Sequence, residues 1–142
     1  MTAHWGPNMR LRPTQDFVAF AHALIDCGAD IFHGHSAHVV QGVEVYKGRL
    51  IMYDTGDFVD DYAVDQDLRN DLSFLFKVMA TKGRIKEVQL VPVQIGDMQV
   101  NKATGAARRF ITERTIKLSA ELGTQLVEGA DGLRVILSEQ PQ

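Results

Sequence analysis

The sequence predicts an α/β fold. Apolar residues recur at helical spacing across residues 17–25, which indicates one buried helix face. Several short apolar runs, bounded by glycine or acidic residues, follow this segment and are typical of strands. A helix, a glycine and a strand that ends in polar side chains occur in that order, and α/β proteins bind ligands beyond the carboxyl ends of such strands. At 142 residues, the chain is expected to form about one domain.

The first helix has recognisable ends. Thr14 is placed to cap its N-terminus, Asp16 suits the positive end of the helix dipole, and Gly28 ends it. We expect His22 to lie partly exposed on this helix and assign it no function. The opening run, residues 4–8, is either a flexible tail or a segment that upstream polypeptide holds in place.

The remaining elements are mostly strands. We expect a turn at Lys47-Gly48, a hairpin around residues 81–83, a loop at residues 101–105 and a second helix at residues 106–122. Pro92 predicts an edge position or a bulge, because proline cannot donate a ladder hydrogen bond. The expected strands are residues 29–32, 41–46, 49–53, 72–79, 85–95, 125–127 and 133–137.

Composition argues against several classes of protein. A net charge of −3 without a basic run argues against nucleic-acid binding. No apolar stretch approaches the length of a membrane span, and residues 1–7 lack the features of a signal peptide. The single cysteine, Cys27, allows no internal disulfide. The chain as given is therefore expected in the cytoplasm.

The most informative stretch is residues 31–40, where three of the five histidines fall within six positions. Imidazole is the commonest metal ligand in proteins. His33 and His35 share a face if they lie on a strand. His35 and His38 can turn toward one pocket, because Gly34 lets the backbone bend. The stretch is therefore either a metal or catalytic site or a polar surface loop, since this spacing alone is not a zinc signature.

Acidic residues form a second polar cluster. Asp54 and Asp57 follow the expected strand at residues 49–53, and five more aspartates come soon after. Such carboxylates could bind a hard cation such as Ca²⁺, but their spacing differs from that of a calcium-binding loop. We therefore expect a solvated acidic loop. The five aspartates are Asp60, Asp61, Asp65, Asp67 and Asp71.

Five ordered motifs carry a family resemblance. They are His4-Trp5-Gly6, Gly28-Ala29-Asp30, Gly34-His35-Ser36-Ala37-His38-Val39, Gln41-Gly42-Val43-Glu44-Val45-Tyr46 and Tyr53-Asp54-Thr55-Gly56-Asp57-Phe58. Together they resemble the bacterial capsule-synthesis family of the CapA type, which is associated with poly-γ-glutamate. That family looks like a branch of the calcineurin-like metallophosphoesterases. From about Asp71 onward, only the general layout is similar.

The resemblance implies a two-metal site that clamps a phosphate and activates a water. His4 and His35 would bind one metal and His38 the other, and Mn²⁺, Fe or Zn²⁺ would suit these ligands. The implied reaction is metal-assisted hydrolysis or transfer at phosphate, on an anionic polymer or another phosphate-containing substrate. Asn8, Ser36, Gln41 and Glu44 would contact substrate or support the ligands, and Asp54 and Asp57 would orient the loop.

The sequence also departs from the family pattern. Ala37 stands where relatives usually have proline, and Asp57 where asparagine is frequent. None of the family's earlier motifs, Asp-x-His, Gly-Asp and Asn-His-Glu/Asp, stands before His4 in this sequence. Residues 1–142 therefore resemble the C-terminal half of an α/β/β/α sandwich, a single partial domain with an incomplete metal site. We expect it to be inactive alone and to self-associate through an exposed sheet edge. Full-length relatives are often membrane-anchored or extracytoplasmic.

Two other hypotheses stay open. The chain could be a non-catalytic module that binds an anionic polymer or a partner chain and contributes its histidines only within an assembly. It could also hold one structural zinc ion, which would survive dialysis at about one equivalent.

Overall fold

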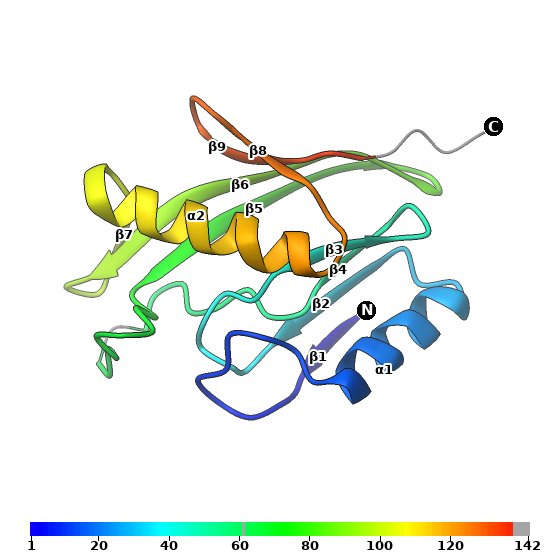
Figure 1. Ribbon diagram of the computed structural model, residues 1–142, viewed down its shortest axis with the longest axis horizontal. Coiled ribbons are helices and arrows are strands. Elements are labelled where there is room, and N and C mark those ends of the chain that lie inside the picture. The colour runs from blue at the N-terminus through cyan, green and yellow to red at the C-terminus, as the bar shows by residue number, and fades with distance from the viewer. Residues whose placement is uncertain (61, 138–142) are drawn as a thin grey trace.

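The computed structural model describes residues 1–60 and 62–137, which form two β-sheets and two α-helices (Figure 1). The α/β class predicted from the sequence is confirmed. The first sheet has the order β1-β2-β4-β3, with β1 (Thr2–His4), β2 (Ile31–His35), β4 (Arg49–Met52) and β3 (Val43–Tyr46). The second has the order β5-β6-β9-β8, with β5 (Leu72–Thr81), β6 (Arg84–Gly96), β9 (Gly132–Val135) and β8 (Leu126–Gly129), and β7 (Gln99–Lys102) also pairs with β6. The helices are α1 (Gln15–Asp26) and α2 (Gly105–Glu121).

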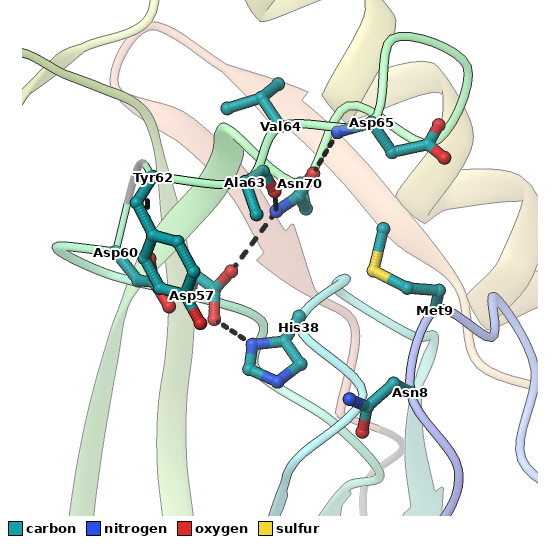
Figure 2. A pocket seen from close by; sticks show the side chains of 10 residues that line it. All are labelled: Asn8, Met9, His38, Asp57, Asp60, Tyr62, Ala63, Val64, Asp65 and Asn70. Atoms are coloured by element: carbon teal, nitrogen blue, oxygen red, sulfur yellow. Dashed lines mark hydrogen bonds and ion pairs between the residues drawn. The ribbon is translucent and has the colours of Figure 1, made fainter.

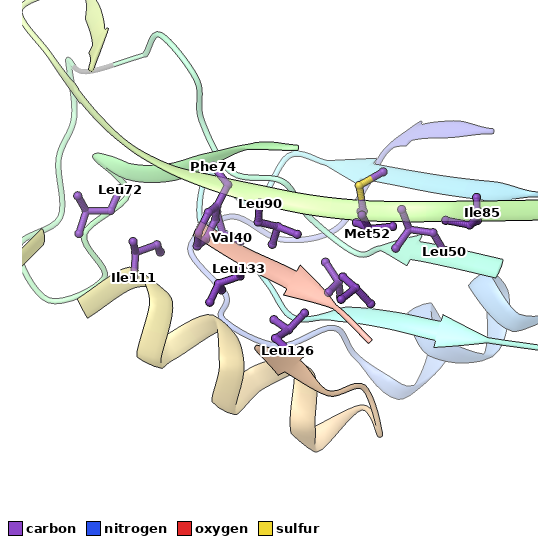
Figure 3. Packing of buried hydrophobic residues seen from close by; sticks show 13 residues of the cluster. Val40, Leu50, Met52, Leu72, Phe74, Ile85, Leu90, Ile111, Leu126 and Leu133 are labelled. Atoms are coloured by element: carbon purple, nitrogen blue, oxygen red, sulfur yellow. The ribbon is translucent and has the colours of Figure 1, made fainter. Parts of the chain in front are cut away.

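Alternate side chains of the first sheet point into two different cores, as the pleat of a strand requires. Phe32 and Ile51 face α1 and pack with Ala21 and Ile25 of that helix. Leu50, the neighbour of Ile51 along β4, faces the opposite way and joins a larger core with residues of the second sheet (Figure 3). The first sheet therefore lies between α1 and the second sheet, while α2 contacts β3 and the second sheet.

Three strands of the first sheet run in the same direction. β1 pairs with β2 and β2 with β4, both in parallel, so their carboxyl ends lie at one edge of the sheet. The register pairs His4 with His35. The chain leaves the same edge after β4 through Tyr53 and Asp54. Residues far apart in the sequence are therefore gathered at this edge.

The expectation for Pro92 is wrong. β6 is not an edge strand, because β5 pairs along one side and β9 and β7 pair along the other. The β5–β6 ladder has its irregularity between Met79 and Ala80, away from the proline. The β9 pairing ends at Leu90 and the β7 pairing begins at Val93. Pro92 lies between these two partners, where the strand needs no donor on that side.

Other expectations are confirmed or corrected. The Thr14 hydroxyl accepts a hydrogen bond from the Phe17 N–H at 3.3 Å and so caps α1. The opening run, residues 4–8, does not begin as a flexible tail, because His4 lies in β1 and the Trp5 N–H donates to the His35 carbonyl at 2.9 Å. The expected loop at residues 101–105 is partly wrong, because β7 includes its first two residues. That the chain is the C-terminal half of a larger sandwich, and a single partial domain, stays a prediction.

Candidate metal centre

His4 and His35 face each other at the carboxyl edge of the first sheet. Their Nδ1 atoms are 3.3 Å apart, and their ring centroids are 5.1 Å apart in an edge-to-face arrangement. Two nitrogens bound at ~2.0–2.1 Å to a tetrahedral ion are also roughly 3.3 Å apart. His4 is exposed and His35 is partly exposed. The pair therefore has both the spacing and the access that a shared metal ion needs.

His33 lies beside this pair, but both of its ring nitrogens have hydrogen-bond partners. Its Nδ1 is 3.1 Å from the Thr2 hydroxyl, and its Nε2 is 3.0 Å from the Thr55 hydroxyl. Burial lowers the pKa of His33, and the neighbouring His35 and the chain's amino terminus lower it further. A neutral imidazole with two hydroxyl partners supports the edge of the sheet, and its nitrogens are not free to bind an ion.

Gly34 lets the strands approach closely enough for the histidine pair to form. A Cβ at this position would lie 2.0 Å from the Tyr53 carbonyl oxygen and 2.5 Å from Nε1 of Trp5. The Trp5 indole donates a hydrogen bond to the Tyr53 carbonyl at 3.1 Å, and the Trp5 N–H donates to the His35 carbonyl at 2.9 Å. The tryptophan therefore fixes the position of His4 next to it.

The loop that carries His38 is held by one buried carboxylate. Asp54 accepts hydrogen bonds from the Ala37 N–H at 2.7 Å and from the Gly56 N–H at 2.9 Å. Burial raises the pKa of Asp54, although these two bonds and the nearby His35 and His38 act in the opposite direction. Asp54 thus connects the loop after β2 with the loop after β4.

His38 lies apart from the His4–His35 pair and faces the acidic segment. Its Nδ1 is 2.8 Å from Oδ1 of Asp57. Together with Asp60 these residues form a group whose candidate ligand atoms all lie within 4.8 Å of one another. The group lines a pocket of about 440 Å³ (Figure 2). The described lining residues are Asn8, Met9, His38, Asp57, Asp60, Tyr62, Ala63, Val64, Asp65 and Asn70, so the pocket holds His38 without His4 or His35.

Asn70 is a supporting residue that the sequence did not reveal. Its buried amide donates to Oδ2 of Asp57 at 3.4 Å and to the Ala63 carbonyl at 2.9 Å, and its oxygen accepts from the Asp65 N–H at 2.8 Å (Figure 2). These bonds turn Oδ1 of Asp57 toward His38. A lone asparagine carries no recognisable spacing, so only the fold could show this role.

The acidic segment is not simply a solvated loop, as the sequence suggested. Asp71 is buried and accepts two hydrogen bonds of 2.7 Å from the Arg69 guanidinium. Asp65 accepts from the backbone N–H groups of Asp67 and Leu68 and so closes a turn. Asp60 lines the pocket described above. Asp67 is exposed, as expected, and Asp61 lies outside the described residues.

The other residues expected near substrate have different surroundings. Ser36 donates to the Gly6 carbonyl at 3.4 Å, and the buried Gln41 donates to the Arg10 carbonyl at 2.9 Å. Glu44 faces α1, where its carboxylate is 2.9 Å from His22. The Tyr53 hydroxyl donates to the same carboxylate at 2.6 Å. Among the residues expected at the site, Asn8 joins His38 and Asp57 in the pocket.

The fold and these side chains define an α/β protein with candidate metal ligands at the carboxyl ends of parallel strands. Residues 1–62 match the family model described as bacterial capsule synthesis protein PGA_cap, so this part of the chain is similar to the bacterial capsule-synthesis family of the CapA type. No helix within the described residues, 1–60 and 62–137, is long and apolar enough to cross a membrane.

Relatives agree with this family. A probable polyglutamine synthesis accessory protein of Mycobacterium tuberculosis is 31% identical over 138 residues, which are 94% of this chain and 36% of that protein. The capsule biosynthesis protein CapA of Bacillus anthracis is 43% identical over 61 residues, 43% of this chain and 15% of that protein. The PGA biosynthesis protein CapA of Bacillus subtilis is 42% identical over 59 residues, 42% of this chain and 16% of that protein. The chain thus spans about a third of the mycobacterial relative, and that similarity extends beyond Asp71 into the second sheet.

Proposed function

We propose that this chain is part of a CapA-type protein that acts in the synthesis of an anionic capsule polymer, with a metal centre for hydrolysis or transfer at phosphate. The observation that carries the proposal is the in-register pair of His4 and His35, whose Nδ1 atoms are 3.3 Å apart at the carboxyl edge of the sheet. His38 contributes from the following loop. Two of the relatives are named for capsule or PGA biosynthesis, which supports a role in making a capsule polymer.

The donor set fits a first-row divalent metal. Imidazole nitrogens with nearby carboxylates suit Zn²⁺, Mn²⁺ or Fe²⁺ better than Ca²⁺ or Mg²⁺, which prefer oxygen ligands. His4 and His35 would hold one ion, and His38 would hold a second. A bound metal would polarise a phosphate oxygen and lower the pKa of a bound water. The chain's own residues hold the ligands in place: Trp5 fixes His4, and Asp54 fixes the loop of His38.

Charge explains why a metal is needed for an anionic substrate. The pocket beside His38 is lined by Asp57, Asp60 and Asp65. Without cations, these carboxylates would repel a phosphate or a polyanion. A divalent ion would reverse the local charge, and Asn8 at the rim could then donate hydrogen bonds to the substrate.

Hydrolysis of an aryl phosphodiester tests the proposal. The proposal predicts a rate that depends on added Mn²⁺ or Zn²⁺ and is lost in His35→Ala, whereas the family resemblance implies that the chain alone is inactive. His22→Ala is the matched control, because His22 contacts Glu44 on the opposite face of the sheet. Equal background rates for the chain and His35→Ala would remove the enzymatic function for this chain. Folding of each variant would be checked by circular dichroism.

One observation favours a second candidate, a non-catalytic assembly module. β1 is an edge strand of the first sheet, so one side of its backbone has no strand partner among the described residues. Such an edge can pair with a strand from another chain or from a second copy. Analytical ultracentrifugation would show a concentration-dependent dimer if copies associate there. A substitution of Thr2 by proline should then weaken the dimer, because Met1 and Trp5 bond to β2 and the backbone N–H of Thr2, between them, faces the open edge.

A further inference from the structure

We infer that His38, Asp57 and Asp60 form a divalent-metal site of their own, which binds an ion without His4 or His35. The loop after β4 places two carboxylates, those of Asp57 and Asp60, next to His38. The inference shares His38 with the proposed function, but it does not require phosphoesterase activity.

The distances among the three side chains are close to those that one ion requires. Donors at about 2.1–2.2 Å from an octahedral ion are roughly 3.0 Å apart when adjacent and roughly 4.3 Å apart when opposite. Nδ1 of His38 and Oδ1 of Asp57 are 2.8 Å apart, and all three candidate ligand atoms lie within 4.8 Å of one another. Small side-chain rotations would bring the three donors onto one ion. Bound water would complete the coordination, for which the pocket of about 440 Å³ has room.

The backbone around the group is held by several independent contacts. Asp54 bonds the loop of His38 to the loop that leads to Asp57, through the Ala37 and Gly56 N–H groups. A backbone bridge between Val40 and Thr55 connects the same two loops. The ligands therefore need little ordering when an ion binds, which reduces the entropy lost on binding.

The carboxylate of Asp57 is held in one orientation by a buried side chain, that of Asn70. Asn70 is 4% exposed, and its amide holds Oδ2 of Asp57 at 3.4 Å. Oδ1 is thereby aimed at Nδ1 of His38, as Figure 2 shows. Carboxylates that bind metals are commonly oriented by such hydrogen bonds from a neighbouring residue. One imidazole and two carboxylates suit Mn²⁺ or Zn²⁺, so we commit to a first-row divalent ion.

Titration of the whole chain with Mn²⁺ tests the inference, by isothermal calorimetry and by the electron paramagnetic resonance signal of free Mn²⁺. We expect about one equivalent at this site, and a roughly tenfold or greater loss of affinity in Asp60→Asn and in His38→Ala. Asp67→Asn is the matched control, because Asp67 is an exposed aspartate of the same segment. Its affinity should equal that of the wild type.

Two results would overturn the inference: unchanged Mn²⁺ affinity in Asp60→Asn, or an equal loss in Asp60→Asn and Asp67→Asn, which would indicate diffuse attraction to acidic residues. Since Asp60 contacts the backbone N–H of Tyr62 only weakly, at 3.4 Å, Asp60→Asn should keep its fold, and a melting curve without metal checks this.

His35→Ala separates this inference from the proposed function. Loss of hydrolysis in His35→Ala with intact Mn²⁺ binding at His38 supports both, whereas Mn²⁺ binding without any hydrolysis supports only the site inferred here.

Discussion

The two sheets of this protein use their polar residues in different ways. In the first sheet, the parallel strands end in His4 and His35, and these side chains are accessible at one edge. In the second sheet and its connections, polar groups are buried and hold the structure together. Ser73, for example, is fully buried and donates to the Thr55 carbonyl at 3.0 Å, which attaches β5 to the loop after β4.

Arg114, in α2, is a second example of buried polar atoms in the second half of the chain. Its guanidinium donates to the Leu68 carbonyl, yet its Nε and Nη2 atoms are buried without a partner among the described residues. Burial, and to a smaller extent the nearby Arg69, lower the pKa of Arg114 to about 10, while Asp71 acts in the opposite direction. The comparison teaches that the polar groups of the second sheet and its connections serve the structure, whereas the first sheet also presents polar side chains at an accessible edge.

The largest effect is expected from Gly34→Ala in the first sheet. The new Cβ would collide with backbone and with the Trp5 indole, so the free energy of unfolding should fall by about 3–5 kcal/mol. Gly96→Ala, at the end of β6, is the control, because nothing lies within 4 Å of its added Cβ. Urea denaturation measures both. Similar losses for the two variants would contradict the close approach at Gly34.

Leu90→Ala separates stability from the site. Leu90 is fully buried in the core of the second sheet, and truncating it should cost about 2–5 kcal/mol of unfolding free energy. At a temperature where the variant stays folded, its Mn²⁺ affinity should match that of the wild type. Weakened metal binding in folded Leu90→Ala would show that the metal site depends on the packing of the second sheet.

Tyr53→Phe should cost less, about 1–2 kcal/mol, because it removes the 2.6 Å hydrogen bond to the buried Glu44. Burial, and then the contact with Glu44, raise the pKa of Tyr53 above its usual value. The neutral phenol is therefore favoured in the folded chain. This stabilisation is complete below a pH of about 10 and is lost as the pH rises further, because the unfolded chain ionises first.

Unfolding free energies measured from pH 8 to pH 11 would check this. The wild type should lose stability more steeply above pH 10 than Tyr53→Phe, and Tyr62→Phe, at a side chain that is 86% exposed, should follow the wild type. Parallel curves for the wild type and Tyr53→Phe would show that this phenol does not contribute to the alkaline limit.

The smallest effect is expected from Asp131→Asn in the second sheet's final turn. Asp131 pairs with Lys102 at 3.4 Å, and both side chains are largely exposed. Solvent and salt screen such a pair, so stability should change by less than ~0.5 kcal/mol. Thermal melting with and without 0.5 M salt would measure it. A larger, salt-sensitive loss would mean that surface charge matters more here than burial suggests.

Local sequence patterns predicted much of the fold. The cap at Thr14 and the apolar face of α1 were recognisable, because helix ends and helix faces depend on neighbouring residues. β1 was not expected as a strand, because its three residues carry no strand pattern and depend on pairing with β2. β7 was missed for the same reason.

The sequence by itself determined the α/β class, the histidine-rich stretch and the family motifs, since these depend on residue type and on spacing along the chain. Only the tertiary structure decided which histidines meet. Parallel pairing joined His4 to His35, while a turn separated His38 and placed it against Asp57. The physical reason is that ligand geometry depends on strand register and on buried supports such as Asn70, and both arise from contacts between residues distant in the sequence.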